Sequence, residues 1–214
     1  MKNIVLSLFL LITSLGAHAQ TSDVFGWVEN QCTMLPKGLL EAVAFTNTQC
    51  HHLTDADYNM PAGDNTAMPR AYGMMGLVRN GKGFFRENLK TVSELSGFTE
   101  QEIMDDTKIN VLAYAKACEK VALQIGVTSK AAEDWIPVIM ELSELPMNTE
   151  KDELPMKMML YSVYYRLGSD LKAVFGDDYD VLSGSISHLR EKQTIRMLYG
   201  FRRRNVTGSS EPRL

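Results

Sequence analysis

Beyond its N-terminal segment, the chain has no apolar run of the roughly 20 residues that a membrane-spanning helix needs. It also lacks alternating apolar and polar segments of strand length, which argues against a sheet-based domain. It has no excess of positive charge, because 22 Lys and Arg residues stand against 26 Asp and Glu residues, a net charge of −4. Nucleic acid is therefore not expected as a partner, since phosphate binding requires clustered cations.

Histidine and cysteine are scarce, with four and three copies in 214 residues. A zinc site needs three or four such ligands at suitable spacing. His51 and His52 are adjacent, so their side chains point in different directions, and only Asp55 and Asp57 could join them from the nearby sequence. We therefore expect neither a metal site nor a cofactor.

The three cysteines allow one disulfide and leave one thiol over. Cys32 and Cys50 flank an expected helix of about twelve residues, whose rise of about 18 Å exceeds the reach of a disulfide. Cys50 with Cys118 is therefore the favoured pair. Three free thiols are the alternative.

The N-terminus has the pattern of a secretory signal peptide. Lys2 gives a positive start, Ile4 to Leu15 form an apolar run, and Ala17-His18-Ala19 supplies small residues before a cleavage site. We expect residues 1–19 to be removed and the protein to be exported, to the periplasm or outside the cell, with no membrane attachment after cleavage. An uncleaved anchor is the alternative, which the shortness of the run disfavours.

The rest of the chain is predicted to be all-α, with one domain over residues 20–175 and a weakly structured tail over 176–214. Thr99 and Glu102 have the spacing of a capping box. Pro137 should kink its helix or mark a second start. Helices are expected at residues 24–30, 36–47, 88–95, 99–105, 107–125, 129–145 and 154–167.

Two segments interrupt the helical pattern. Residues 51–70 form a long loop rich in Asp, Asn, Pro and Gly, and long loops inside a domain are usually functional or mobile. Residues 71–83 place small and apolar residues between glycines. This pattern predicts a close approach of the backbone to a ligand or to a neighbouring helix.

Three motifs occur in an order that resembles the lysozyme-like lytic transglycosylases. That family typically has a helix ending Ala-x-Ala-aromatic-x-Glu-Ser, then Gly-Leu-Met-Gln, then a helix with Asp, Asn-Ile, small residues and Tyr. The corresponding stretches here are AVAFTNT at 42–48, YGMMG at 72–76 and DTKINVLAYA at 106–115. The resemblance covers about residues 24–170 and implies a lysozyme-like helical fold.

More narrowly, the chain resembles the helical N-terminal region of secreted N-acetylmuramoyl-L-alanine amidases of the Bacteroidota. In those proteins the region precedes a zinc-dependent amidase domain. Such a domain needs zinc ligands on a mixed sheet, and the few histidines of this chain do not supply them. The resemblance implies a secreted module that acts on or near peptidoglycan and takes glycan strands as its partner.

Asn47 stands where the family has its catalytic glutamate, and Gly76 replaces the family's glutamine. The glutamate moves a proton to and from the sugar, whereas an amide has no proton to transfer near neutral pH. We therefore expect glycan binding without cleavage. Asn110 is expected as a buried polar anchor, and core packing is the alternative for the Tyr72 segment. The expected substrate-binding residues are Asn47, Tyr72, Met74, Met75, Asn110 and Tyr114.

Two other functions stay open at this point. An active glycosidase or transglycosylase would need a substitute acid, and Asp55, Asp57 and Asp64 in the loop are the choices, although such acids usually stabilise turns. Glu41 lies six positions before Asn47, about 240° around the helix, and should face away. The third function is a partner-binding domain without glycan affinity.

Overall fold

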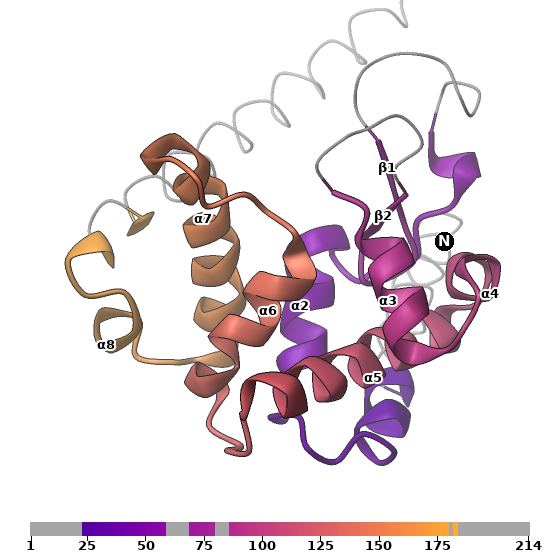
Figure 1. Ribbon diagram of the computed structural model, residues 1–214, viewed down its shortest axis with the longest axis horizontal. Coiled ribbons are helices and arrows are strands. Elements are labelled where there is room, and N and C mark those ends of the chain that lie inside the picture. The colour runs from indigo at the N-terminus through magenta and orange to yellow at the C-terminus, as the bar shows by residue number, and fades with distance from the viewer. Residues whose placement is uncertain (1–22, 59–68, 80–85, 180–181, 184–214) are drawn as a thin grey trace, which may run out of the picture. The chain divides into compact units, whose positions relative to one another are not determined.

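The computed structural model describes residues 23–58, 69–79, 86–179 and 182–183. These residues are mostly helical, which confirms the all-α prediction at the level of fold class (Figure 1). The contacts divide the chain into two units, residues 1–169 and 170–214, and each unit is described by itself. The expected signal peptide, the loop centre with Asp64, and most of the expected tail lie outside the described residues.

The first unit begins with a helical segment over residues 23–29. None of the described helices combines the length and the apolarity needed to cross a membrane. The second unit contributes α8 (Leu171–Phe175) and the 3-10 helix η3 (Gly176–Asp178). The further elements of the first unit are α2 (Leu39–Thr48), η1 (Asp55–Asp57), β1 (Arg70–Tyr72), β2 (Leu77–Arg79), α3 (Asn88–Ser96), α4 (Glu100–Asp105), α5 (Thr107–Ile125), η2 (Ala132–Trp135), α6 (Ile136–Ser143) and α7 (Glu150–Leu167).

Local capping sets the ends of α4 and α5 where the sequence predicts them. Thr99 N donates to the Glu102 carboxylate (2.8 Å), and Glu102 N donates to Thr99 Oγ1 (3.2 Å), which confirms the capping box. The Asp106 carboxylate accepts from the backbone N–H groups of Lys108 and Ile109 and so caps α5. Gly126 ends α5 in the left-handed conformation.

The two prolines that were expected to mark helix starts behave differently. Pro137 lies in the first turn of α6, so the second-start prediction is confirmed. The helix expected over residues 36–47, with Pro36 in its first turn, instead begins at Leu39. Leu39 N donates to Pro36 O in a turn (3.2 Å), and the left-handed Gly38 separates that turn from the first residue of α2.

A short antiparallel hairpin departs from the purely helical prediction. Ala71 of β1 lies opposite Val78 of β2, and Tyr72 lies opposite Leu77. Strands of three residues are too short to give an alternating pattern, so the sequence carries no strand signal here. The pairing depends on tertiary contacts, since β2 packs on α3 and Leu53 bridges to Gly73.

The core of the first unit is built around α5. Helices α3, α4 and α6 pack against α5, and α2 packs against α7 (Figure 1). Val111 and Ala115 of α5 are fully buried, as is Trp135 of η2, while Ile125 at the helix end is exposed. Helix α5 is therefore buried along its centre and exposed at its C-terminal end.

The cysteines are free thiols, so the predicted Cys50–Cys118 disulfide is wrong and the alternative of three free thiols holds. Cys118 is fully buried on α5, and Cys50 follows the end of α2 half-buried. Burial raises the pKa of Cys118, and the charge of Cys32 adds to that rise. The neighbour of Cys118 is therefore Cys32, which sequence spacing did not indicate.

Candidate functional site: a cavity beside Asn47

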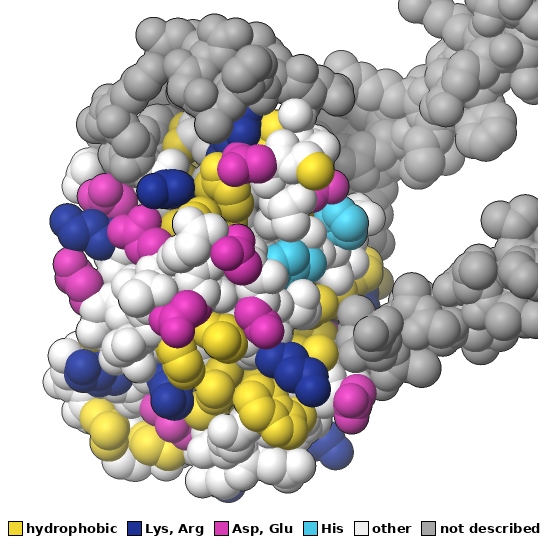
Figure 2. Space-filling model, turned by 90° about the vertical axis from the view of Figure 1, so that its right-hand side faces the viewer, with side chains coloured by type: hydrophobic (Ala, Val, Ile, Leu, Met, Phe, Trp, Pro, Cys, Tyr) yellow, Lys and Arg dark blue, Asp and Glu magenta, His cyan; other side chains and the backbone are white. Residues whose placement is uncertain are grey.

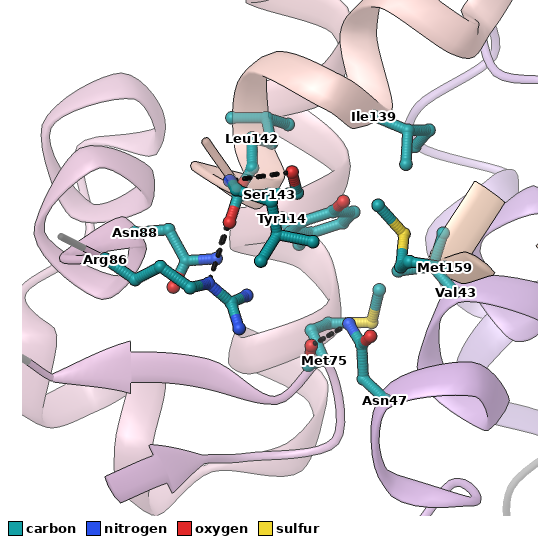
Figure 3. A pocket seen from close by; sticks show the side chains of 11 residues that line it. Val43, Asn47, Met75, Arg86, Asn88, Tyr114, Ile139, Leu142, Ser143 and Met159 are labelled. Atoms are coloured by element: carbon teal, nitrogen blue, oxygen red, sulfur yellow. Dashed lines mark hydrogen bonds between the residues drawn. The ribbon is translucent and has the colours of Figure 1, made fainter. Parts of the chain in front are cut away.

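A cavity of about 50 Å³ opens between α2, the hairpin turn, α3, α5, α6 and α7 (Figure 3). Such a space holds a few water molecules or one small substituent of a ligand. It lies within the first unit. Its lining residues are Val43, Asn47, Met75, Arg86, Asn88, Tyr114, Ile139, Leu142, Ser143, Leu145 and Met159.

Three of the predicted binding residues come together at this cavity, although they are far apart in sequence. Asn47, Met75 and Tyr114 line it. They come from the end of α2, the hairpin turn and the middle of α5. The structure therefore brings parts of all three family-like motifs to one place.

Asn47 ties α2 to the hairpin turn. Its Nδ2 donates to Met75 O (2.9 Å), and Thr48 Oγ1 donates to Met74 O (2.6 Å) (Figure 3). The Asn47 side chain is nevertheless exposed. Its Oδ1 is thus a possible acceptor at the rim of the cavity, while the amide nitrogen has a structural partner.

Gly76 allows the hairpin turn to dock on α2. A Cβ atom at this position would lie 3.0 Å from the Asn47 Cβ and 3.1 Å from the Thr48 Cγ2, and the φ of Gly76 is +66°. The glutamine of the family pattern therefore has no room here. The predicted close approach of the glycine-rich segment to a neighbouring helix is confirmed.

Asn110 is the buried polar anchor that was expected. It is fully buried, its Oδ1 accepts from Met75 N (2.8 Å), and its Nδ2 donates to Ile103 O (3.0 Å). Asn110 does not line the cavity. Its hydrogen bond to Met75 N fixes the hairpin turn, so Asn110 affects the cavity only by positioning Met75.

Tyr72 and Met74 do not line the cavity either. Both are buried, and the Tyr72 hydroxyl donates to Asp55 Oδ1 (2.8 Å). Burial raises the pKa of Tyr72, and Asp55 raises it further. Tyr72 and Met74 therefore pack in the core, which is the alternative stated for this segment.

Sequence analysis missed three polar lining residues, Arg86, Asn88 and Ser143. The Asn88 amide is fully engaged, because Oδ1 accepts from Val78 N (2.7 Å) and Nδ2 donates to Leu142 O (3.0 Å). Arg86 lies two residues before Asn88, and its Nε donates to Ser143 O (2.8 Å). No periodicity or motif distinguishes Arg86 from a solvated cation, so the sequence carried no signal for it.

The loop acids are held in local contacts away from the cavity. Hydrogen bonds from Tyr72 and Arg70 lower the pKa of Asp55. His51 and Thr54 lower the pKa of Asp57 to about 2, the His51 hydrogen bond being the larger cause. Both carboxylates therefore stabilise turns, as the alternative stated.

No Asp or Glu side chain is among the described residues that line the cavity. Glu41 is exposed and lies elsewhere, as expected from its place on the helix. Burial raises the pKa of Tyr114 well above 10, so its phenol stays protonated at neutral pH. Among these residues we find no group suited to exchange a proton with a sugar near pH 7.

Figure 2 shows a face on which acidic and basic side chains are interspersed around the histidines. His51 Nε2 lies 3.0 Å from Asp57 Oδ1, and His52 Nε2 lies 2.9 Å from Met104 O. In the part of the chain that the structure describes, no group of three or more His, Cys, Asp or Glu residues could hold a metal ion.

No family model, curated protein or solved structure matches this chain. The resemblance to lysozyme-like proteins thus depends on the three motifs alone. Functional assignment starts from the cavity, its lining residues and their hydrogen bonds.

Proposed function

We propose that the protein is an exported, peptidoglycan-directed binding module with a lysozyme-like helical fold, which holds glycan strands without cutting them. One observation carries this proposal: Asn47, at the position of the family's glutamate, lies at the rim of a cavity whose described lining includes no carboxylate. The three motifs are the reason for proposing a glycan as the substrate class. The absence of a carboxylate from the described lining is the reason for proposing binding without cleavage.

The missing proton donor is a sufficient reason for inactivity. General acid–base catalysis contributes on the order of a hundredfold to ten-thousandfold to such a reaction. Asn47 cannot supply it, and its Nδ2 is bound to Met75 O. Hydrogen-bond partners lower the pKa values of Asp55 and Asp57, which keeps both carboxyls ionised at neutral pH. Neither residue lines the cavity. No observation here favours the active glycosidase over the binding module.

The size of the cavity sets the binding mode. A volume of about 50 Å³ is too small for a whole sugar ring. We expect one substituent of the glycan to enter while the ring stays at the rim beside the exposed Asn47. In the amidase-like architecture that the resemblance implies, such binding would raise the local concentration of substrate for a linked catalytic domain.

Two assays on purified cell walls test the proposal together. We expect the protein to sediment with insoluble peptidoglycan and to leave the turbidity of a cell-wall suspension unchanged. Clearing of the suspension would instead identify a glycosidase. Absence of both retention and clearing would identify a partner-binding domain and would reject our proposal.

A variant pair locates the binding surface. Asn47→Ala removes the rim amide and its bond to Met75 O, so we expect weaker retention on peptidoglycan. Asn148→Ala is the matched control, because Asn148 is exposed and lies outside the cavity. Equal retention of the two variants would place any glycan contact away from Asn47.

A further inference from the structure

Arg86 is a half-buried cation beside the cavity. Its side chain reaches over one end of the lining, where Nε donates to Ser143 O (2.8 Å) (Figure 3). No hydrogen bond joins the two terminal guanidinium nitrogens to another described residue, and these nitrogens are not buried, so they are open to a ligand or to water. The nearby Glu144 carboxylate accepts from Glu87 N and Thr91 Oγ1, and it forms no ion pair with Arg86.

The other arginines beside this hairpin are neutralised. Arg70 pairs with Asp55 (2.6 Å), and Arg79 pairs with Glu100 (3.6 Å). Arg86 forms no such ion pair among the described residues; burial lowers its pKa, and the charge of the nearby Glu144 carboxylate offsets only part of that effect. A cation removed from water is unfavourable unless an opposite charge or good acceptors compensate it. The bound ligand is a natural source of that compensation.

We infer that the cavity is a carboxylate-binding site, in which the terminal nitrogens of Arg86 hold the carboxylate of a small substituent on the ligand. The inference rests on the proposed function for the identity of that ligand, a glycan, and narrows it to glycan whose lactyl carboxylate is not joined to a stem peptide. The cation and the cavity are independent of the family resemblance.

The donors of the cavity favour a carboxylate over a phosphate. A guanidinium offers a planar fork that matches the two oxygens of a carboxylate. The Asn88 amide is occupied by backbone groups, and the Ser143 hydroxyl donates to Met140 O (2.8 Å). A single cation suits a single negative charge, whereas a phosphate of nearly two charges needs more charged donors than Arg86 alone supplies.

The remaining walls define what the carboxylate is attached to. Val43, Ile139 and Met159 line the cavity with apolar groups. With about 50 Å³ available, a carboxylate on a one- or two-carbon alkyl group fits better than a longer acid. With a neutral sugar substituent, the Arg86 charge would be compensated only in part, by Glu144.

A matched pair of sugars tests the inference on the full chain. N-acetylmuramic acid and N-acetylglucosamine differ only in the lactyl ether that carries a carboxylate. We expect N-acetylmuramic acid to bind at least tenfold more tightly by calorimetry or by NMR titration. Its methyl ester, which lacks the charge, should bind like N-acetylglucosamine, and inorganic phosphate should bind more weakly than N-acetylmuramic acid.

Substitutions then assign the preference to Arg86. Arg86→Gln should reduce the affinity for N-acetylmuramic acid at least tenfold and leave that for N-acetylglucosamine unchanged. Arg86→Lys keeps the charge without the fork and should give a smaller loss. Arg79→Gln, at an exposed arginine outside the cavity, should change neither affinity. Circular dichroism checks folding, and the methyl ester gives the same answer on the parent protein if Arg86→Gln fails to fold.

The outcomes separate this inference from the proposed function. If both sugars bind equally and peptidoglycan retention persists in Arg86→Gln, the glycan module stands and the carboxylate site is rejected. If N-acetylmuramic acid binds through Arg86 but neither intact peptidoglycan nor glycan strands freed of stem peptides are retained, the carboxylate site stands and the glycan module is rejected. If no carboxylate sugar binds at all, the inference is overturned.

Discussion

At the scale of single residues, the hairpin turn depends on a glycine that no other residue can replace. A Cβ atom on Gly73 would lie 1.9 Å from the Asn110 Nδ2, and the φ of Gly73 is +69°. Asn110 in turn holds Met75 N at the cavity wall. The site is thus positioned by a backbone-to-amide contact that tolerates no side chain.

Gly73→Ala should therefore destabilise the protein by about 3 kcal/mol, the sum of a left-handed alanine and a displaced buried amide. Gly97→Ala is the control, because Gly97 has φ +83° with no atom within 4 Å of its would-be Cβ. It should lose only about 1 kcal/mol. Urea unfolding measures both, and equal losses would show that Asn110 moves aside freely.

At the scale of elements, η1 is a 3-10 turn closed by its own carboxylate. Asp57 Oδ2 accepts from Thr54 N (2.7 Å) and Thr54 Oγ1 (3.0 Å), and Oδ1 faces His51 Nε2 (3.0 Å). These bonds require the ionised acid. The stability of this turn therefore depends on pH through the ionisation of the exposed Asp57 carboxyl.

The pKa of Asp57 is lowered from 3.8 to about 2, mainly by the His51 hydrogen bond. Because the folded-state pKa is the lower one, the stabilisation is fully present above about pH 4 and is lost as pH falls toward 2. Asp57→Asn should unfold at a lower temperature at pH 7, and the difference should shrink as pH falls below 4 and vanish only below about pH 2. A carboxyl NMR titration should show a midpoint near 2, and a midpoint near 3.8 would contradict the closed turn.

The helices could be predicted because their signals are local. The capping box of Thr99 and the glycines that end α3 and α5 act within a few residues of each helix end. The hairpin could not be predicted, because its strands gain stability from α3 and from Leu53 rather than from their own sequence. The start of α2 could not be predicted from Pro36 either, because the left-handed Gly38 separates Pro36 from the first residue of the helix.

At the scale of the whole first unit, the cavity joins residues from position 43 to position 159. Asn47, Met75 and Tyr114 could be predicted because each belongs to a motif with a known partner motif. Arg86 could not, since its environment is created only when α3, α6 and the hairpin meet. A residue such as Arg86, whose role depends on its burial, can be recognised only from the folded structure.

Burial also bears on whether a chain with three free thiols can be exported. An oxidising compartment pairs accessible thiols, but Cys32 and Cys118 are buried in the first unit, and burial raises the pKa of Cys32 to about 11. Both are thereby kept from forming the reactive thiolate. Cys50 is half-buried and its pKa is raised less, so it is the thiol open to reagents.

Thiol titration with Ellman's reagent tests this protection. The native protein should react at Cys50 alone, and the protein unfolded in guanidinium should react at all three cysteines. Cys50→Ser should abolish the native reaction and leave two thiols after unfolding. A single thiol after unfolding of the parent protein would mean that one disulfide forms in solution. In that case burial would not protect two of the three thiols from oxidation, and the protection inferred from their burial would be wrong.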